Sequence, residues 1–311
     1  MIKIATYEIG KRYNLPLLVK DVKNGLTNKG AAYLSMTLAD NTGTIEAKMW
    51  EVKEEDIELI KVGQILNFCF DTLDYKGQVQ ARVLKVNICN ETINLADFII
   101  SSVFSKEERQ KQLQDILNLI KNPCLHQLVV GLLTKVGQKY MDYPAAAKIH
   151  HAFLGGLSEH SLGMVKLANA ICDLYPQLNR DLLVSGCIVH DIGKTAEMSG
   201  PIATEYTLEG KLEGHISLAN GWLTEVAHEL NLESNEETIL LHHMILSHHG
   251  HLEYGSPVLP CLQEAEILSF IDNIDARLNI LRNALKDIAK GNWTSRIFAL
   301  ENRQFYKPKG K

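Results

Sequence analysis

The chain has 311 residues, enough for two domains with buried cores, and its 46% hydrophobic and 22% charged residues are typical of a soluble protein. It holds no 18-residue apolar stretch, no signal-peptide core after Met1 and no C-x-x-C pair among its six cysteines, so we expect a cytoplasmic protein without a membrane span, disulfide framework or zinc ribbon. The net charge of −5 is uneven, because residues 91–275 carry 11 basic and 24 acidic side chains, whereas residues 276–311 carry nine and two.

Residues 13–86 alternate between apolar and polar side chains with a period of two, and turn residues separate the runs, which indicates strands. The run Asp40-Asn41-Thr42-Gly43 has the composition of a hairpin turn. We expect strands at about residues 15–22, 32–39, 44–50, 66–70 and 79–83, with a helical segment at 54–60 before the fourth. Five short strands and one helix predict a small barrel.

This arrangement resembles an OB-fold, a barrel that binds oligonucleotides on the face of its second and third strands through stacked aromatic and basic groups. The resemblance implies a nucleic-acid-binding face formed by outward side chains of this kind: Tyr33, Lys48 and Trp50, flanked by Tyr75 and Arg82. The alternative is that Trp50 points outward because it packs against a second domain.

The residues after the barrel change in character. Asn90 to Asp97 has the polar composition of a linker, and Ser105-Lys106-Glu107-Glu108 is a capping box that opens an amphipathic helix. We therefore expect a barrel at residues 1–90, a linker with bracing helices at 91–144, and a helical domain with a basic tail at 145–311. The acidic middle of the chain suits a site that holds cations, and the basic tail is either a phosphate contact or a solvated helix end.

Histidines crowd residues 150–251, which hold eleven of the twelve in the chain. Apolar residues at steps of three to four indicate five helices from about residue 157 onward. Each helix offers one or two metal ligands near an end or along one face: His160, His190 with Asp191, His215, His248 with His249, and Asp272. A helical bundle builds a metal pocket in this way, from facing helices.

This set supplies six or seven nitrogen and oxygen ligands and no thiolate, enough for two divalent cations that share Asp191. A single histidine on an apolar helix is more often a hydrogen-bonded core residue, so the prediction rests on the order of the ligands. His242 and His243 are rival candidates for His248 and His249, because a seven-residue step returns to the same helix face. We favour the second pair, since the glycine that follows it ends the helix and exposes both rings.

In order and helical placement, these ligands resemble those of the HD superfamily of metal-dependent phosphohydrolases over about residues 145–290. The resemblance implies that His160, the His190-Asp191 pair and Asp272 form the core metal site. It also implies that the histidines between them mark a two-metal member. Some relatives carry a third metal on a glutamate four residues before the first histidine, but Gly156 occupies that position here.

Over its whole length the chain is similar to the YhaM-type 3′→5′ exoribonucleases. The likeness is carried by the segments Gly155–Leu157, His190–Lys194, Ser199–Tyr206, Ser247–Gly250 and Ala299–Arg303. It implies a multidomain α and β chain in which an OB-like barrel is followed by an all-α HD-type domain. It also implies that the chain removes nucleotides from the 3′ end of single-stranded RNA. It further implies Mn²⁺ as cofactor, with Co²⁺, Fe²⁺ or Zn²⁺ as alternatives. Asp191 would bridge two ions, and Lys194 would be a second catalytic residue beside the scissile phosphate.

Two other classes of function stay open. An HD-type nucleotide phosphohydrolase or phosphodiesterase would use the same metal site, although the Gly-Tyr-Pro of cyclic-dinucleotide relatives is absent after Gly250. A non-catalytic nucleic-acid-binding protein would use the metals for structure only, and the complete ligand set argues against it. The sequence also leaves open the metal used in the cell, single-stranded DNA as a further substrate, and whether the chain forms a homo-oligomer.

Overall fold

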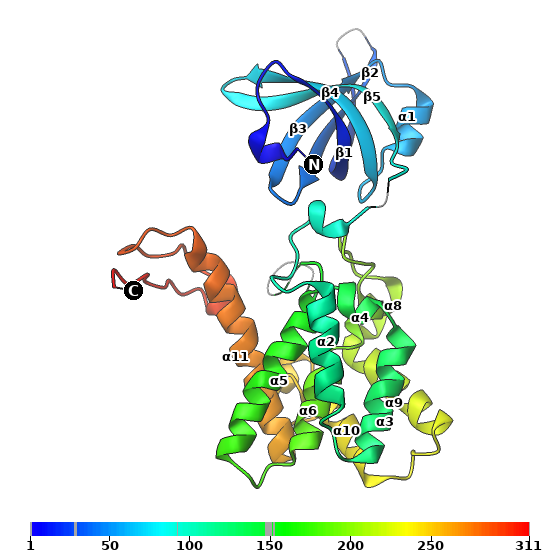
Figure 1. The fold of residues 1–311 in the computed structure, drawn as a ribbon, viewed down its shortest axis with the longest axis vertical. Coiled ribbons are helices and arrows are strands. Elements are labelled where there is room, and N and C mark those ends of the chain that lie inside the picture. Colours follow the sequence, from blue (N-terminus) through cyan, green and yellow to red (C-terminus); the bar gives the residue numbers. More distant parts are fainter. Residues whose placement is uncertain (1, 28–29, 92, 147–150, 152, 311) are drawn as a thin grey trace. The chain divides into compact units, whose positions relative to one another are not determined.

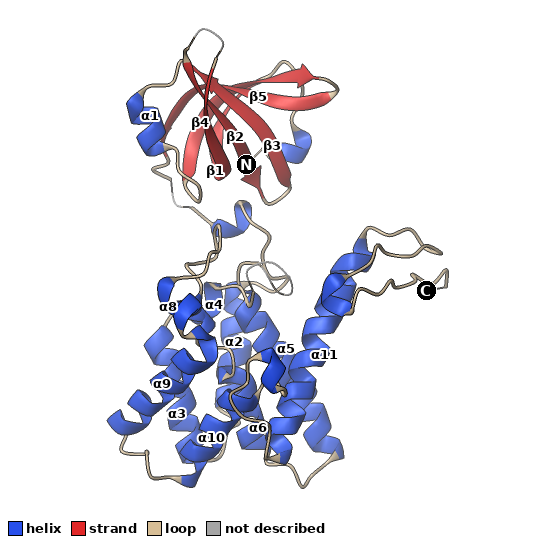
Figure 2. Cartoon of the chain, turned by 180° about the vertical axis from the view of Figure 1, so that it is seen from behind, coloured by secondary structure: helices blue, strands red, loops and turns tan. Residues whose placement is uncertain are grey.

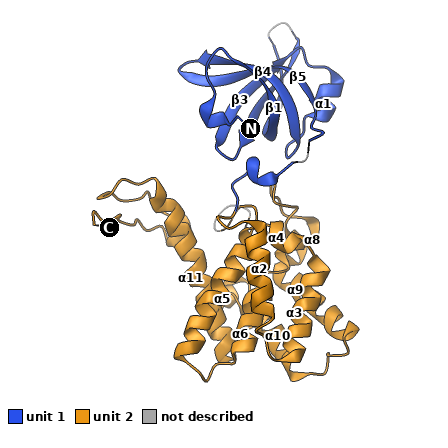
Figure 3. Ribbon diagram, in the orientation of Figure 1, with its two compact units in different colours: residues 1–101 blue, residues 102–311 orange. Residues whose placement is uncertain are grey.

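The computed structural model describes residues 2–27, 30–91, 93–146, 151 and 153–310. The chain divides into two compact units, residues 1–101 and residues 102–311, which Figure 3 distinguishes by colour. Each unit has a hydrophobic core of its own. Among the described residues, no helix is long and apolar enough to span a membrane.

The first unit, in its described part, is a closed barrel of five strands (Figure 2). The strands are joined in the order β1-β2-β3-β5-β4, and β3 pairs with β5 in parallel while the other neighbours are antiparallel. Their bounds are β1 (Arg12–Leu26), β2 (Ala32–Asp40), β3 (Gly43–Trp50), β4 (Ile65–Tyr75) and β5 (Gln78–Ile88), with α1 (Glu54–Leu59) before β4 and the 3-10 helix η1 (Ile4–Thr6) before β1. The predicted OB-like barrel is confirmed.

The barrel core follows from the period-two pattern of its strands. Ile45, Ala47 and Met49 of β3 are buried in the barrel, and Phe68 and Phe70 of β4 are fully buried beside them. Alternate residues of β3 therefore face solvent, which leaves their side chains available for binding.

Asp40 fixes the hairpin between β2 and β3. Its Oδ1 accepts hydrogen bonds from the N–H groups of Thr42 and Gly43, at 2.7 and 3.2 Å, and its Oδ2 accepts one from the N–H of Ile4 at 2.7 Å. An aspartate that satisfies turn donors in this way stabilises a tight connection. The hairpin thereby sets the register in which β2 and β3 present their outward side chains.

The second unit is helical, with α5 and α6 packed at its centre (Figure 1). Its helices are α2 (Lys106–Leu117), α3 (Pro123–Val136), α4 (Lys139–Asp142), α5 (Gly156–Leu174), α6 (Arg180–Val189), α7 (Lys194–Glu197), α8 (Leu208–Leu212), α9 (Gly214–Glu229), α10 (Glu236–Ser247) and α11 (Gln263–Lys286), with the 3-10 helices η3 (Leu252–Tyr254) and η4 (Phe298–Leu300). The predicted all-α character of this domain is confirmed.

Side-chain caps define where the first helices of this unit begin. Ser105 Oγ accepts a hydrogen bond from the Glu108 N–H at 3.1 Å, and the Glu108 carboxylate accepts one from the Ser105 N–H at 2.8 Å, so the predicted capping box is confirmed. Asn122 caps α3 by accepting hydrogen bonds from the N–H groups of Cys124 and Leu125, both at 3.0 Å. Local sequence signals therefore place both helices.

The segment 91–144, which the sequence assigns to a linker and bracing helices, is divided between the two units in the structure. The 3-10 helix η2 (Leu95–Asp97) belongs to the first unit, where Asp97 pairs with Lys3 at 2.9 Å and its carbonyl accepts the Asn41 N–H at 3.0 Å. The helices α2 to α4 belong to the second unit. The division into residues 1–90, 91–144 and 145–311 stays a prediction about roles, because compactness alone assigns no role to a segment.

Candidate metal centre

The predicted ligands come together at helix ends and along one helix face. They are His160 in the first turns of α5, His190 and Asp191 at the end of α6, His215 at the start of α9, His248 and His249 at the end of α10, and Asp272 within α11. Gly193 lies against the backbone carbonyl of His215, where a Cβ atom would collide with that oxygen. The glycine after the His-Asp pair therefore allows the start of α9 to approach it closely.

Asp191 lies at the centre of the cluster and is almost fully buried. Its Oδ1 is 3.4 Å from Nε2 of His215 and 3.6 Å from Nε2 of His248, and its Oδ2 is 3.4 Å from Nε2 of His190. The two carboxylate oxygens thus face histidines from different helices, which is the geometry expected of a ligand shared by two cations.

The remaining donor atoms form two groups around this carboxylate. His160, His190 and Asp272 offer donor atoms within 4.8 Å of one another, and His160 Nε2 is 3.2 Å from Asp272 Oδ1. The second group is His215 with His248 and His249, whose donor atoms also lie within 4.8 Å of one another. The first group has nitrogen and oxygen donors and the second has nitrogen donors only, and borderline divalent cations bind both kinds.

Backbone carbonyls orient three of the rings from outside the cluster. Nδ1 of His190 donates to the Cys187 carbonyl at 3.1 Å, and Nδ1 of His248 donates to the Ile245 carbonyl at 2.7 Å. Nδ1 of His249 donates to another backbone carbonyl, also at 2.7 Å. Because a carbonyl only accepts, these bonds place the proton on Nδ1 and leave a lone pair on Nε2 for a metal.

Carboxylates orient the other two rings. Glu197 Oε1 accepts a hydrogen bond from His215 Nδ1 at 3.0 Å, and Asp275 Oδ2 accepts one from His160 Nδ1 at 2.7 Å. Asp275 Oδ2 also lies 2.9 Å from Nε2 of His151. Carboxylate partners of this kind fix the orientation of a metal-binding imidazole and raise its basicity.

The sequence analysis did not identify Glu197, Asp275 or His151. Asp275 follows Asp272 by one helical turn of α11, so the spacing was a usable signal for it. Its place depends on Gly163 of α5, because a Cβ atom there would lie 2.7 Å from Asp275 Oδ1. No local pattern marks Glu197, which reaches His215 only through the packing of α7 against α9.

The buried donor atoms of the cluster fit a cation. Among the described residues, none gives a hydrogen bond to Asp191 Oδ1 or to Nε2 of His190, His215 or His248, although all of these atoms are buried. Buried polar atoms without partners are costly and rare. Their convergence around one carboxylate is therefore explained by divalent metal binding.

The charge states of Asp191 and His249 are those that a site for a divalent cation requires. Burial lowers the pKa of His249 to about 4, assisted by the neighbouring His248, so its ring is neutral at pH 7. Burial alone would raise the pKa of Asp191, but Lys194 and His190 hold it well below its usual range. Burial also opposes a charge on His160, yet Asp272 pulls its pKa up to about 9. The cluster thus combines ionised carboxylates with neutral rings such as His249, whereas the His160 ring is protonated at pH 7 and releases a proton when its Nε2 binds a cation.

Lys194 lies beside the carboxylate at the centre. Its Nζ donates a hydrogen bond to Asp191 Oδ2 at 2.5 Å, and its side chain is 12% exposed. Burial opposes the charge on Lys194, but the contact with Asp191 raises its pKa. It therefore remains a cation next to the cluster.

The rival histidines of α10 have partners elsewhere. Nδ1 of His242 is 2.6 Å from Asn220 Oδ1, and Nε2 of His243 accepts a hydrogen bond from the Cys261 N–H at 2.8 Å. The structure brings His248 and not these two residues into the cluster.

The predicted nucleic-acid-binding residues of the barrel lie mostly together. The Tyr33 and Trp50 rings are 5.0 Å apart between centroids, with Lys48 Nζ within 5.8 Å of both rings, and Trp50 is 46% exposed. Arg82 pairs with Lys48 in the β3–β5 register. The structure does not bring Tyr75 to this group, because it lies at the β4–β5 turn opposite residue 78.

Comparisons with known proteins found similarity over the second unit and over nearly the whole chain. The family described as HD domain matches residues 157–277. The chain is 42% identical over 307 residues to the 3′-5′ exoribonuclease YhaM of Geobacillus sp. (strain WCH70), and the match covers 98% of this chain and 94% of that protein. Among solved structures, the chain is similar to the second OB-fold domain of replication protein A from Methanococcus maripaludis, with 18% identity, 30% of this chain and 98% of that chain covered, and a TM-score of 0.25. A TM-score of 0.25 does not establish a shared fold, so the barrel assignment rests on the strand order itself.

Proposed function

The chain belongs to the YhaM family of 3′-5′ exoribonucleases, and on this premise we propose that it removes nucleotides from the 3′ end of single-stranded RNA by metal-dependent hydrolysis at the cluster around Asp191. The observation that carries the proposal is the set of buried, unpartnered donor atoms that converge on this carboxylate in the described part of the chain.

The ligand set supports two cations. His160, His190 and Asp272 would hold one, and the three histidines of the second group, His215, His248 and His249, would hold the other. Asp191 would contribute one carboxylate oxygen to each, since its two oxygens face different histidines. The donors favour Fe²⁺, Co²⁺ or Zn²⁺ over the harder Mg²⁺, because imidazole nitrogens outnumber carboxylate oxygens. We propose Mn²⁺ as the ion because the resemblance to the exoribonuclease family implies it, and carboxylates in the first group supply the oxygen donors that it prefers.

The chain's own residues prepare the phosphodiester for attack. When bound, two divalent cations lower the pKa of a water molecule and neutralise charge on the phosphoryl oxygens. Lys194 is placed to contact a phosphoryl oxygen, because it remains charged and stays partly exposed next to Asp191. In the reaction the water oxygen joins phosphorus, the bond to the upstream 3′ oxygen breaks, and that oxygen takes up a proton. The products are a nucleoside 5′-monophosphate and an RNA shortened by one nucleotide.

The barrel supplies a candidate single-strand-binding surface. Tyr33 and Trp50 present adjacent rings, and the Lys48 ammonium lies over both of them, which suits stacked bases and a phosphate backbone. Arg82 extends this surface onto β5, although it also pairs with Asp71 at 3.1 Å. We propose that this face retains long strands between successive cleavages.

The direction and class of the reaction can be tested with one pair of substrates. A single-stranded RNA is labelled at its 5′ end or at its 3′ end and incubated with the protein and Mn²⁺, with chelator in place of Mn²⁺ as the control. We expect the 5′-labelled strand to give a ladder and the 3′-labelled strand to release labelled mononucleotide at once. The same incubation with single-stranded DNA, and with Co²⁺, Fe²⁺ or Zn²⁺, measures the preferences for substrate and metal.

Other outcomes would favour the alternative functions. Hydrolysis of free nucleotides or cyclic dinucleotides without cleavage of RNA would indicate a nucleotide phosphohydrolase or phosphodiesterase. Tight binding of RNA with no product in any metal would indicate a non-catalytic nucleic-acid-binding protein. Release of mononucleotide first from the 5′-labelled strand would contradict the proposed direction.

A further inference from the structure

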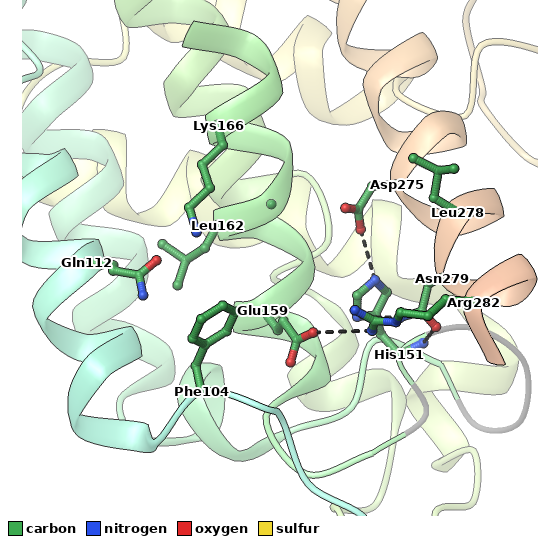
Figure 4. Close-up of a pocket in the computed structure, with 11 residues that line it drawn as sticks. Phe104, Gln112, His151, Glu159, Leu162, Lys166, Asp275, Leu278, Asn279 and Arg282 are labelled. Carbon is green, nitrogen blue, oxygen red and sulfur yellow. Dashed lines mark hydrogen bonds and ion pairs between the residues drawn. The ribbon is translucent and has the colours of Figure 1, made fainter. Parts of the chain in front are cut away.

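A cavity of about 230 Å³ lies among α2, α5 and α11, beside the metal centre but outside it (Figure 4). It is lined by aromatic, acidic, basic and amide side chains, among them Phe104, Gln112, Glu159, Lys166, Asp275 and Arg282. None of these residues is among the proposed metal ligands. The cavity is therefore a separate feature of the same unit.

The cavity is connected to the metal centre along α11. Asp272, Asp275, Asn279 and Arg282 follow one another at steps of three and four residues, so they share one face of this helix. Asp275 lines the cavity and also accepts the hydrogen bond from His160. At 1.5 Å per residue, the seven residues from Asp272 to Asn279 span about 10 Å along the helix. The cavity therefore lies within about 10 Å of the proposed metal site along this helix.

Glu159 gives the cavity an unsatisfied acceptor. It directly precedes His160 in α5, and the residue is 8% exposed. Its Oε1 lies 3.5 Å from an Arg282 nitrogen, a long contact, and no described residue gives a hydrogen bond to its buried Oε2. A buried carboxylate oxygen without a partner is costly, so this position calls for a ligand that donates hydrogen bonds.

Phe104 gives the cavity an aromatic surface. Its ring is 39% exposed and lies on the side of the cavity nearest α2, with the Lys166 ammonium 5.2 Å from its centroid. Bases stack on exposed aromatic rings whatever their sequence, and a nearby cation suits a base carbonyl or a phosphate. An aromatic ring together with an acceptor carboxylate matches a nucleoside, whose ribose carries two adjacent hydroxyl donors.

We propose that this cavity receives the terminal nucleoside of the RNA, with its base on Phe104 and its 2′- and 3′-hydroxyl groups donating to Glu159. The proposal rests on the exoribonuclease function above and deepens it, because it assigns recognition of a ribose at the 3′ end. The 2′-hydroxyl is the group by which a protein distinguishes RNA from DNA at a given nucleotide. A site built to accept a hydroxyl hydrogen bond rejects the analogue that lacks it.

The experiment compares two RNA strands that differ only in their last nucleotide, which carries either a ribose or a 2′-deoxyribose. The measured quantity is kcat/KM for release of that nucleotide in Mn²⁺. Because a hydrogen bond to a charged group is lost, we expect the parent protein to prefer the ribose by roughly 10- to 100-fold. Glu159→Ala should bring this ratio close to one, and Glu159→Gln should give an intermediate ratio. Glu229→Gln, at an exposed position of α9, is the matched control and should keep the parental ratio.

Two further measurements separate recognition from a structural role. Calorimetric titration of the metal-free protein with adenosine 5′-monophosphate and its 2′-deoxy analogue should show the same preference without any turnover. Phe104→Leu should weaken both titrations by about 5- to 100-fold, because it removes the stacking surface and keeps an apolar side chain. Phe104 is partly exposed, so this variant should melt at the parental temperature and tests the cavity even if Glu159→Ala does not fold.

The results distinguish this inference from the proposed function. If the parent removes nucleotides from RNA 3′ ends but releases ribose and 2′-deoxyribose ends equally well, the cavity does not read the ribose and the inference is wrong. Full retention of the preference in folded Glu159→Ala would overturn it as well. If the parent releases no nucleotide from either strand, the proposed exoribonuclease function fails first.

Discussion

Replacing Asp275 with asparagine should weaken metal binding although Asp275 is not a proposed ligand. Its Oδ2 lies 2.7 Å from Nδ1 of His160 and 2.9 Å from Nε2 of His151, so one carboxylate oxygen serves two rings. Burial alone would raise the pKa of Asp275, but the hydrogen bonds from the two rings hold it well below its usual range, and it is ionised at pH 7. An asparagine offers one carbonyl oxygen without this charge, and its amide group would oppose a ring N–H.

The expected size of the effect follows from the position of His160. Its Nδ1 bond to Asp275 keeps Nε2 directed at Asp272, so without it the ring can turn or change tautomer. Loss of such an outer partner typically reduces metal affinity by about 10- to 100-fold, or about 1.4 to 2.8 kcal/mol at 1.4 kcal/mol per tenfold.

The assay is a titration of metal-free protein with Mn²⁺ against a competing chelator at pH 7. Asp287→Asn, an exposed position just after α11, is the matched control and should bind Mn²⁺ like the parent. An Asp275→Asn protein that melts at the parental temperature and binds Mn²⁺ within threefold of the parent would refute the reasoning. In that case the carboxylate would serve only to fill the space between α5 and α11.

Four further predictions test other parts of the molecule. Asp191→Ala should abolish hydrolysis and release bound metal, as measured by turnover and by metal analysis. Near-normal turnover and metal content would contradict the proposal that Asp191 is a ligand of both cations. Residues 102–311 alone should hydrolyse a small phosphodiester at the parental rate but lose affinity for long RNA, and equal affinity would exclude a role for the barrel. Trp50→Ala should raise the apparent KM for RNA by about 5- to 100-fold with an unchanged melting temperature, because the ring is exposed, and a large drop in melting temperature would make it a packing residue. The Arg12 guanidinium holds the pKa of Asp71 at about 2 instead of 3.8. The Arg12–Asp71 pair therefore stabilises the barrel fully above pH 3.8, and this contribution is lost as the pH falls towards 2. Asp71→Asn should therefore make the stability of residues 1–101 less dependent on pH between 3.8 and 2, as measured by acid unfolding monitored through Trp50 fluorescence. An unchanged acid transition would show that the pair contributes nothing.

Local patterns were sufficient to predict the elements and the order of the ligands. The strands of the barrel follow from alternation, as in Ile45, Ala47 and Met49, because one face of each strand is buried. The His-Asp pair at residues 190–191 could be placed at a helix end because Gly193 follows it. These signals lie within a few residues of the groups they position, so one sequence is enough to find them.

The rest of the site depends on packing between distant segments. His242 and His249 are seven residues apart and share one face in a helical pattern, and the contact of His242 with Asn220 on α9 distinguishes them. Glu197 and Glu159 look like ordinary surface acids, because their environment is created by helices far away in the sequence. The sequence predicts that Tyr75 and Arg82 flank one binding face, but the strand register places them apart, because Tyr75 lies opposite Gln78 and Arg82 lies opposite Asp71.

Gly163 is unfavourable for the stability of α5 but favourable for the position of Asp275. Glycine inside a helix such as α5 lowers its stability by about 0.5 to 1 kcal/mol relative to alanine, so selection for a stable fold alone would tend to replace it. A methyl group there would lie 2.7 Å from Asp275 Oδ1 and would push that carboxylate away from His160. Selection for activity therefore favours the less stable residue. Lineages of this enzyme that lose the glycine should have rebuilt the carboxylate as well, so the two positions are expected to change together during evolution.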